Sequence, residues 1–317
     1  MTAPAEALRI PNRRYFTAAA PILAAVAVVG YLIGHAHAGS ASPAKTRTLS
    51  TSRFLLDYPS GWRRAAGGPE IPGLPIMHAV VLAPGGEASH VGLVVGQLAG
   101  GEASPLPPSF VASMPRLPST AVVDLLEVQA YRYAQLEIPG SSQSLTLYAI
   151  PNPAGSETIL ACYAAGGFSD QLRECDQIVA TVTLAGQALS YDLTPEPAYA
   201  RELSSAIAGL NALRLDLRRM MGPGAPPAVV AALAGRLAAR FADTAAGLTT
   251  LEPSLIARRA QAALSKAIVG ARRAYTALAA AAGSPSRSQP ARQQVYQAEA
   301  DVNAALADFS LLGYAQP

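Results

Sequence analysis

Between residues 53 and 186, apolar and polar positions alternate in short runs, which is the pattern of β-strands with a buried face. In the first run, Phe54, Leu56 and Tyr58 share one face, and the turn sequence Pro59-Ser60-Gly61 follows. Further strands are predicted at residues 78–82, 91–98, 122–128, 131–138, 144–150 and 157–163. Short turns join most of these strands and favour antiparallel pairing, because a parallel crossover needs about a dozen residues or more.

A helix is predicted after the last strand, at residues 169–181, with Ser169 as its N-cap. A shorter helix is predicted at residues 108–114. The fold expected for residues 53–186 is therefore an α+β domain, in which a C-terminal helix packs on an antiparallel sheet. The apolar stripe of that helix consists of Leu172, Cys175, Ile178 and Val179.

After residue 191 the hydrophobic period changes to 3.6 residues, which is typical of amphipathic helices. Thr194 and Pro195 fit the N-cap and first position of the first helix, and Gly222 and Gly283 end the first and third. Short loops between long helices predict an all-α up-down four-helix bundle over residues 194–317. Its helices are expected at residues 195–221, 227–251, 253–282 and 289–312.

Residues 15–34 are apolar and uncharged, and a helix of this length can cross a bilayer core of about 30 Å. Arg9, Arg13 and Arg14 precede the segment, and basic residues resist translocation. The pattern predicts a cytoplasmic tail at residues 1–14, a single transmembrane anchor, and an extracytoplasmic C-terminus. The small and polar residues 35–52 are expected to form a flexible tether.

A cleavable signal peptide is the alternative for the N-terminal segment. Ala36-His37-Ala38 before Gly39 fits the small-x-small rule of signal peptidase, and cleavage after Ala38 would release a secreted protein. The apolar stretch, however, exceeds the roughly 7–15 residues usual for a signal peptide. Both interpretations place the remaining chain outside the cytoplasm.

The predicted export affects the interpretation of the two cysteines of the chain, Cys162 and Cys175. An even number of cysteines in an oxidising compartment favours a disulfide. The spacing is too long for C-x-x-C redox chemistry, and no histidine lies nearby to complete a metal site. We therefore predict a structural disulfide.

The charge of the chain is nearly balanced, with 24 Lys and Arg against 21 Asp and Glu in 317 residues. This balance argues against a nucleic-acid-binding protein that relies on a strong positive field. The helical half is basic, with 13 basic against 9 acidic residues from residue 191 onward. Arginine pairs such as Arg214 and Arg218 either form solvated helix faces or attract an anionic envelope polymer.

Catalytic motifs are not found in the sequence: it has no phosphate loop, no G-x-G-x-x-G and no G-x-S-x-G. No catalytic, cofactor or metal-binding residue is predicted, and a non-enzymatic protein is expected. Asp170, Glu174 and Asp176 form a solvated helix face, or an acid–base group in the alternative case of an enzyme. Aromatic side chains on neighbouring strands form a candidate binding surface or simply cover the sheet; they are Tyr131, Tyr133, Tyr148 and Tyr163.

Three features of residues 53–186 form one pattern: an opening strand that ends in Tyr58-Pro59-Ser60-Gly61-Trp62, a final strand that ends at Cys162, and a following helix with Cys175. This pattern resembles the exported PsbP/Mog1-like domains of actinobacteria, of which the LpqN-type lipoproteins are one branch. The resemblance covers about residues 53–186. It implies an α/β/α-like sheet and, in most members, a non-enzymatic binding or accessory role. Unlike the lipoproteins, this chain has no lipid-bearing cysteine.

Together these features lead to the hypothesis of a non-catalytic, membrane-anchored extracytoplasmic binding or accessory protein of the bacterial cell envelope. Candidate partners are an envelope protein, a lipid or an anionic polymer, and no nucleic acid or cofactor is expected. The alternative is an extracytoplasmic enzyme with a cleft in the sheet domain.

Overall fold

The computed structural model describes residues 45–315, except 89, 99–102, 138–142, 153–155, 167, 186–190 and 223. The predicted cytoplasmic tail, membrane anchor and signal-peptide cleavage site lie outside this part of the chain. Among the helices that the structure describes, none has the length and apolar character of a membrane span.

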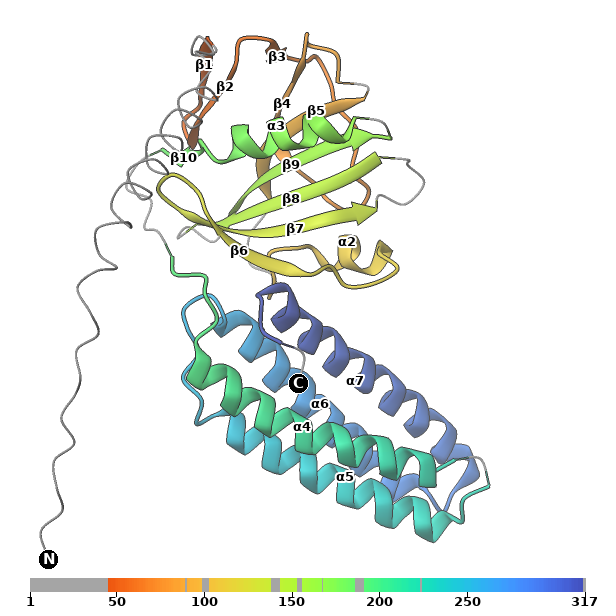
Figure 1. The fold of residues 1–317 in the computed structure, drawn as a ribbon. Helices are drawn as coiled ribbons and strands as arrows, with labels where there is room; N and C mark the ends of the chain where they lie inside the picture. Colours follow the sequence, from red (N-terminus) through yellow and green to blue (C-terminus); the bar gives the residue numbers. More distant parts are fainter. Residues whose placement is uncertain are drawn as a thin grey trace, which may run out of the picture. The chain divides into compact units, whose positions relative to one another are not determined.

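Seven antiparallel strands form the main sheet, in the order β3-β4-β5-β9-β8-β7-β6 (Figure 1). All of these strands except β3 were predicted from the period-two pattern, with their ends shifted by up to four residues. The strands are β3 (Trp62–Arg64), β4 (Met77–Pro84), β5 (Val91–Leu98), β6 (Thr120–Asp124), β7 (Gln129–Glu137), β8 (Gln143–Pro151) and β9 (Glu157–Ala165).

A second, three-stranded sheet has the order β1-β2-β10 and consists of β1 (Thr46–Ser50), β2 (Phe54–Pro59) and β10 (Thr183–Leu184). Strand β1 lies within the predicted tether, so that prediction was wrong for residues 46–50. The strand pairs antiparallel with β2, where Leu49 faces Leu56, and both side chains are buried. A five-residue strand with a single buried side chain has too little periodicity to be detected in the sequence.

Two short helices accompany the sheets: α2 (Pro108–Ser113) and α3 (Ser169–Val179). Helix α3 packs against β9, β5 and β2 through the side chains of Cys175, Ile178 and Val179. Its N-cap is Phe168 rather than the predicted Ser169, and no side chain caps this end. The predicted α+β arrangement, a C-terminal helix on an antiparallel sheet, is confirmed.

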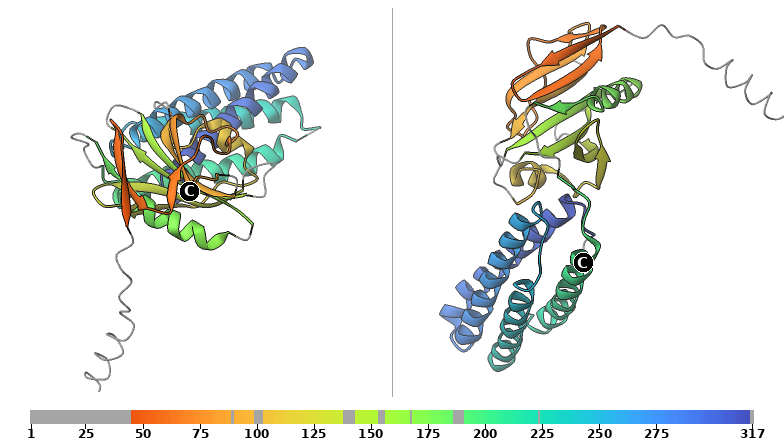
Figure 2. Two further views of the ribbon diagram at one scale, coloured as in Figure 1. Left: turned by 90° about the horizontal axis from the view of Figure 1, so that it is seen from above. Right: turned by 90° about the vertical axis from the view of Figure 1, so that its left-hand side faces the viewer.

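The second half of the described chain contains the four predicted long helices, which lie side by side in the two views of Figure 2. They are α4 (Pro197–Met220), α5 (Pro227–Leu248), α6 (Arg258–Ala281) and α7 (Pro285–Leu311). Helix α4 begins after the N-cap Glu196, two residues later than predicted, because Pro197 rather than Pro195 occupies its first position. Helix α7 begins at Pro285 and includes Pro290.

Residues Thr46–Pro317 form one compact unit. A single apolar cluster includes Tyr131 of the sheet and Phe309 of the bundle. Two hydrogen bonds in the described structure join strands to α7: Tyr133 Oη donates to Leu311 O at 2.6 Å, and Thr120 Oγ1 donates to Ser310 O at 2.9 Å. In the segment before α4, Leu193 N donates to Gln129 Oε1 of β7 at 2.8 Å. Whether the bundle folds without the sheet domain therefore stays a prediction.

Candidate functional site

The four tyrosines of the candidate aromatic surface are all buried, and none has more than 4% of its surface exposed. Tyr131 and Tyr133 of β7 lie on the same sheet face as Tyr163 of β9, whereas Tyr148 of β8 belongs to the core on the opposite face. The four rings therefore do not form an exposed binding surface. The sequence pattern marks which side chains share a face, but it does not show that both faces of this sheet are covered.

Tyr163 has a packing role. Its hydroxyl donates a hydrogen bond to the carbonyl oxygen of Ala88 at 2.8 Å, and burial raises the pKa of the phenol to about 12. A Cβ atom at Gly92 on the neighbouring strand would lie 2.4 Å from this hydroxyl. The glycine is therefore needed because the Tyr163 side chain occupies the space above it.

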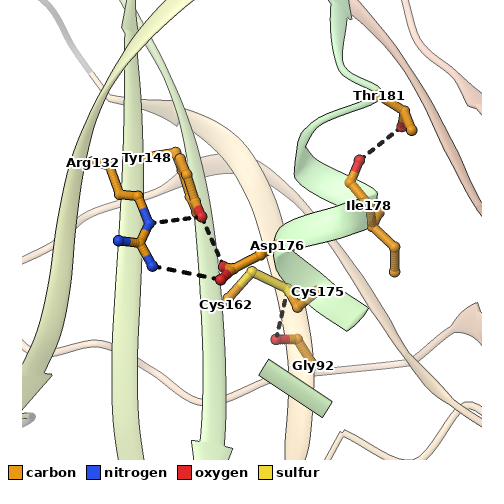
Figure 3. The surroundings of a disulfide bond; sticks show 8 residues. All are labelled: Gly92, Arg132, Tyr148, Cys162, Cys175, Asp176, Ile178 and Thr181. Carbon is orange, nitrogen blue, oxygen red and sulfur yellow. Dashed lines mark hydrogen bonds and ion pairs between the residues drawn. A yellow bond between two sulfur atoms is a disulfide. The ribbon is translucent and has the colours of Figure 1, made fainter. Parts of the chain in front are cut away.

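On the opposite face, a polar cluster connects the sheet to α3 next to the disulfide (Figure 3). Tyr148 donates to Asp176 Oδ1 at 2.7 Å, and Arg132 Nε donates to Tyr148 Oη at 3.0 Å. Arg132 Nη2 lies 3.5 Å from Asp176 Oδ2, with each charged side chain about one-third exposed. Burial, followed by the hydrogen bond to Asp176, raises the pKa of Tyr148 to about 12.

The predicted disulfide is confirmed: Cys162 of β9 is bonded to Cys175 of α3, and both residues are fully buried. The adjacent residue, Asp176, was a candidate for acid–base chemistry. Its carboxylate instead accepts hydrogen bonds from Tyr148 and Arg132. The disulfide and this carboxylate together hold α3 on the sheet.

A second polar cluster lies inside the bundle, around the buried carboxylate of Glu299 on α7. Arg214 Nε of α4 donates to Glu299 Oε2 at 2.9 Å, and the Nη2 of the same guanidinium also contacts this oxygen. Tyr275 of α6 donates to Glu299 Oε1 at 2.8 Å. Burial, followed by the nearby Glu299 charge, raises the pKa of Tyr275. Arg214 completes its hydrogen bonds with Asn211 and Asn303.

Beside this cluster, a groove with a cavity volume of about 950 Å³ opens between α4 and α7. Arg218 reaches from its wall to Glu299 Oε2 at 3.4 Å, and Arg292 Nη1 donates to the carbonyl oxygen of Met221 at 3.3 Å. Arg219 has no ion-pair partner among the described residues. The groove is lined by Leu215, Arg218, Arg219, Met221, Gly222, Gln289, Arg292, Gln293 and Tyr296.

Three guanidinium groups and no carboxylate line this groove in the described structure, so it can accept an anionic group through charge-assisted hydrogen bonds. We name it the arginine groove. The sequence pointed to Arg214 and Arg218 as a helical pair. Arg292 and Tyr296 were missed because they approach α4 only through the tertiary fold.

No protein-family model matches the sequence, and no curated protein is significantly similar to it. Several solved structures show a weak likeness. A protein from Bacteroides thetaiotaomicron has 11% identity and a TM-score of 0.28, and the match covers 69% of this chain and 73% of that protein. The cyanobacterial PsbP protein CyanoP from Synechocystis has 14% identity and a TM-score of 0.30, with 46% and 96% covered.

The third structure is LpqN of Mycobacterium tuberculosis, a protein involved in cell envelope biogenesis. Its identity is 14% and its TM-score 0.28, and the match covers 46% of this chain and 87% of LpqN. TM-scores this low do not establish a common fold for the whole chain.

Proposed function

We propose that this chain is a non-catalytic extracytoplasmic binding or accessory protein of the bacterial cell envelope, held at the membrane by residues 15–34 with its N-terminus in the cytoplasm. The observation that carries the proposal is the buried disulfide between Cys162 and Cys175. Disulfides persist in oxidising compartments and are rare in the cytosol. The bond thus supports export, as do the uncharged segment and the three arginines before it.

The hydrogen bonds of the carboxylates in the two polar clusters favour binding over catalysis. Asp176 accepts hydrogen bonds from Tyr148 and Arg132, and Glu299 accepts them from Arg214 and Tyr275. A general base needs a lone pair directed at a substrate proton. These carboxylates are instead engaged with neighbouring side chains, whereas the arginine groove presents hydrogen-bond donors to the solvent.

Membrane topology tests the proposal directly. The full-length protein, with different epitope tags at its two ends, is expressed in a bacterial host, and intact spheroplasts are treated with protease. We expect loss of the C-terminal tag, protection of the N-terminal tag, and recovery of the protein in the membrane fraction. Protection of the C-terminal tag until the cells are lysed would contradict the extracytoplasmic assignment.

The intact mass of the membrane-extracted protein tests the anchor separately. A retained N-terminal segment is expected. A mature form that begins at Gly39 would contradict the anchor and indicate a secreted protein. As a control for orientation, a variant with Arg9, Arg13 and Arg14 replaced by glutamate should lose the cytoplasmic preference of its N-terminus.

A further inference from the structure

We propose that the arginine groove between α4 and α7 binds an acidic saccharide, in which a carboxylate or phosphate is attached to one or more sugar rings. The proposal deepens the binding function above and depends on it only for access to envelope saccharides. The lining of the groove contains three arginines, two glutamines and one tyrosine.

The positive charge of the three groove arginines is not fully neutralised by nearby carboxylates of the described structure. The carboxylate of Glu299 already forms a close ion pair with Arg214, and Arg218 reaches the same oxygen only at 3.4 Å. Arg219 and Arg292 have no carboxylate partner among the described residues. Because guanidinium groups present a planar set of donors, they pair with carboxylate and phosphate oxygens in two-pronged geometry.

The C-terminus of α4 also attracts these arginines, but it is too weakly charged to account for them. A helix C-terminus carries about half a negative charge, which falls off within the last turn. Arg292 satisfies the carbonyl oxygen of Met221 in this turn. Arg218 and Arg219 add two further positive charges within the last turn. The excess positive charge therefore remains available for an anionic ligand.

The size of the groove indicates a ligand larger than a simple inorganic anion. Clefts of roughly 300–1,000 Å³ hold ligands of many atoms, and the cavity volume here is about 950 Å³. A lone phosphate would leave most of this space filled with water. The acidic group is therefore one part of the ligand, and the remaining lining residues contact the rest.

The remaining lining residues fit a sugar better than an acyl chain. Gln289 and Gln293 carry amides that donate and accept hydrogen bonds, as ring hydroxyls require. Tyr296 is 65% exposed and offers a flat apolar face with a polar edge. The aliphatic lining consists of Leu215 and the buried Met221, so a continuous apolar path for a lipid tail is not formed by these residues.

Isothermal titration of the full-length protein tests the ligand class. The protein is kept in a polyoxyethylene detergent, because a maltoside headgroup would itself be a sugar. Tetragalacturonate is the probe that carries carboxylates, and glucose 6-phosphate is the probe that carries a phosphate. Maltotetraose is the neutral saccharide for comparison. We expect one or both acidic probes to bind at least tenfold more tightly than maltotetraose. Equal binding of inorganic phosphate would overturn the saccharide part of the proposal.

Matched variants test the location. Arg219→Gln removes one charge from the groove, and Arg236→Gln removes one from an exposed position on α5 outside it. We expect Arg219→Gln to weaken binding about tenfold, Tyr296→Ala to weaken it severalfold, and Arg236→Gln to change it less than twofold. Equal loss of binding in the two arginine variants would show that the ligand does not bind in the arginine groove. The proposal would also be overturned if the protein bound phosphatidylglycerol nanodiscs more tightly than the acidic probes, and if neither maltotetraose nor tetragalacturonate displaced the nanodiscs. Neither result would affect the topology on which the proposed function depends.

Discussion

Arg214 and Glu299 lie 85 positions apart in the sequence and form a buried ion pair between α4 and α7, with Nε 2.9 Å from Oε2. The guanidinium also donates to Asn303 of α7 at 3.0 Å. Polar side chains thus span this helix pair where apolar residues would ordinarily interdigitate. Long side chains hold the helices together without closing the space between them, and the arginine groove lies at this junction.

Removal of one partner of this pair should destabilise the bundle strongly. Glu299→Leu leaves the Arg214 charge buried without its carboxylate, and breaking a buried pair in this way costs about 3–5 kcal/mol. Urea unfolding of the full-length protein, followed by circular dichroism at 222 nm, measures the change. The double variant Arg214→Met/Glu299→Leu should lose less stability than the single variant, because no buried charge remains. A double variant that is less stable than Glu299→Leu alone would contradict this account.

Loss of the disulfide should weaken the sheet domain. Cys162 and Cys175 are 13 positions apart, and closure of such a loop contributes about 3 kcal/mol in the chain-entropy model. We expect the double variant Cys162→Ala/Cys175→Ala to unfold at lower urea concentration by about this free energy. Thiol labelling of the unreduced, denatured wild-type protein should find no free sulfhydryl, and labelling at both positions would show that the bond does not form in the cell.

Alkaline pH should destabilise the fold through Tyr148. Burial raises the pKa of its phenol to about 12, above the ordinary value near 10, so the folded protein keeps a proton that the unfolded chain releases. The resulting stability is complete below pH 10 and is lost as the pH rises through 12. Unfolding free energies between pH 9 and 12 should therefore decrease less steeply in Tyr148→Phe than in the wild type. An identical slope in both proteins would assign the alkaline sensitivity to other groups.

Substitution of Gly92 should be costly. A methyl group at this position would meet the Tyr163 hydroxyl at 2.4 Å and the carbonyl oxygen of Leu82 at 2.9 Å. Such overpacking typically costs about 1–3 kcal/mol, which thermal unfolding of Gly92→Ala will measure. The matched control is Gly235→Ala on α5, where nothing lies within 4 Å of the added atom. That variant should gain up to about 1 kcal/mol from helix propensity, and equal effects in the two proteins would contradict the packing argument.

A fragment of residues 190–317 should remain helical, because each of its four helices follows a local hydrophobic period of 3.6 residues. The fragment loses the hydrogen bond from Tyr133 to Leu311 and the burial of Leu311 against the sheet. We therefore expect a strongly helical circular dichroism spectrum and a cooperative melt at a lower temperature than in the full chain. Tyr133→Phe in the full chain should reproduce part of the loss. A disordered spectrum of the fragment would show that the bundle needs the sheet domain to fold.

The elements of this fold are largely encoded by local patterns. The run from residue 91 to residue 98 was predicted with the bounds of β5, and the number and order of the long helices were also correct. Errors occurred where the local signal was ambiguous. Two prolines compete for the first position of α4, and Ser169 follows the N-cap of α3 rather than serving as one.

Local patterns in the sequence were enough to predict the long helices, the longer strands and the disulfide between Cys162 and Cys175, but not the short strands β1, β3 and β10. The strands and helices follow from hydrophobic periodicity and turn residues, which act over short distances along the chain, and the disulfide follows from the even number of cysteines. Three features depend on the folded chain: Tyr131 and Tyr148 are buried on opposite faces, Arg214 pairs with Glu299, and Arg292 lies across a groove from Arg219. Periodicity specifies that a face is buried but not what covers it, because the covering residues come from distant segments that meet only when the chain has folded.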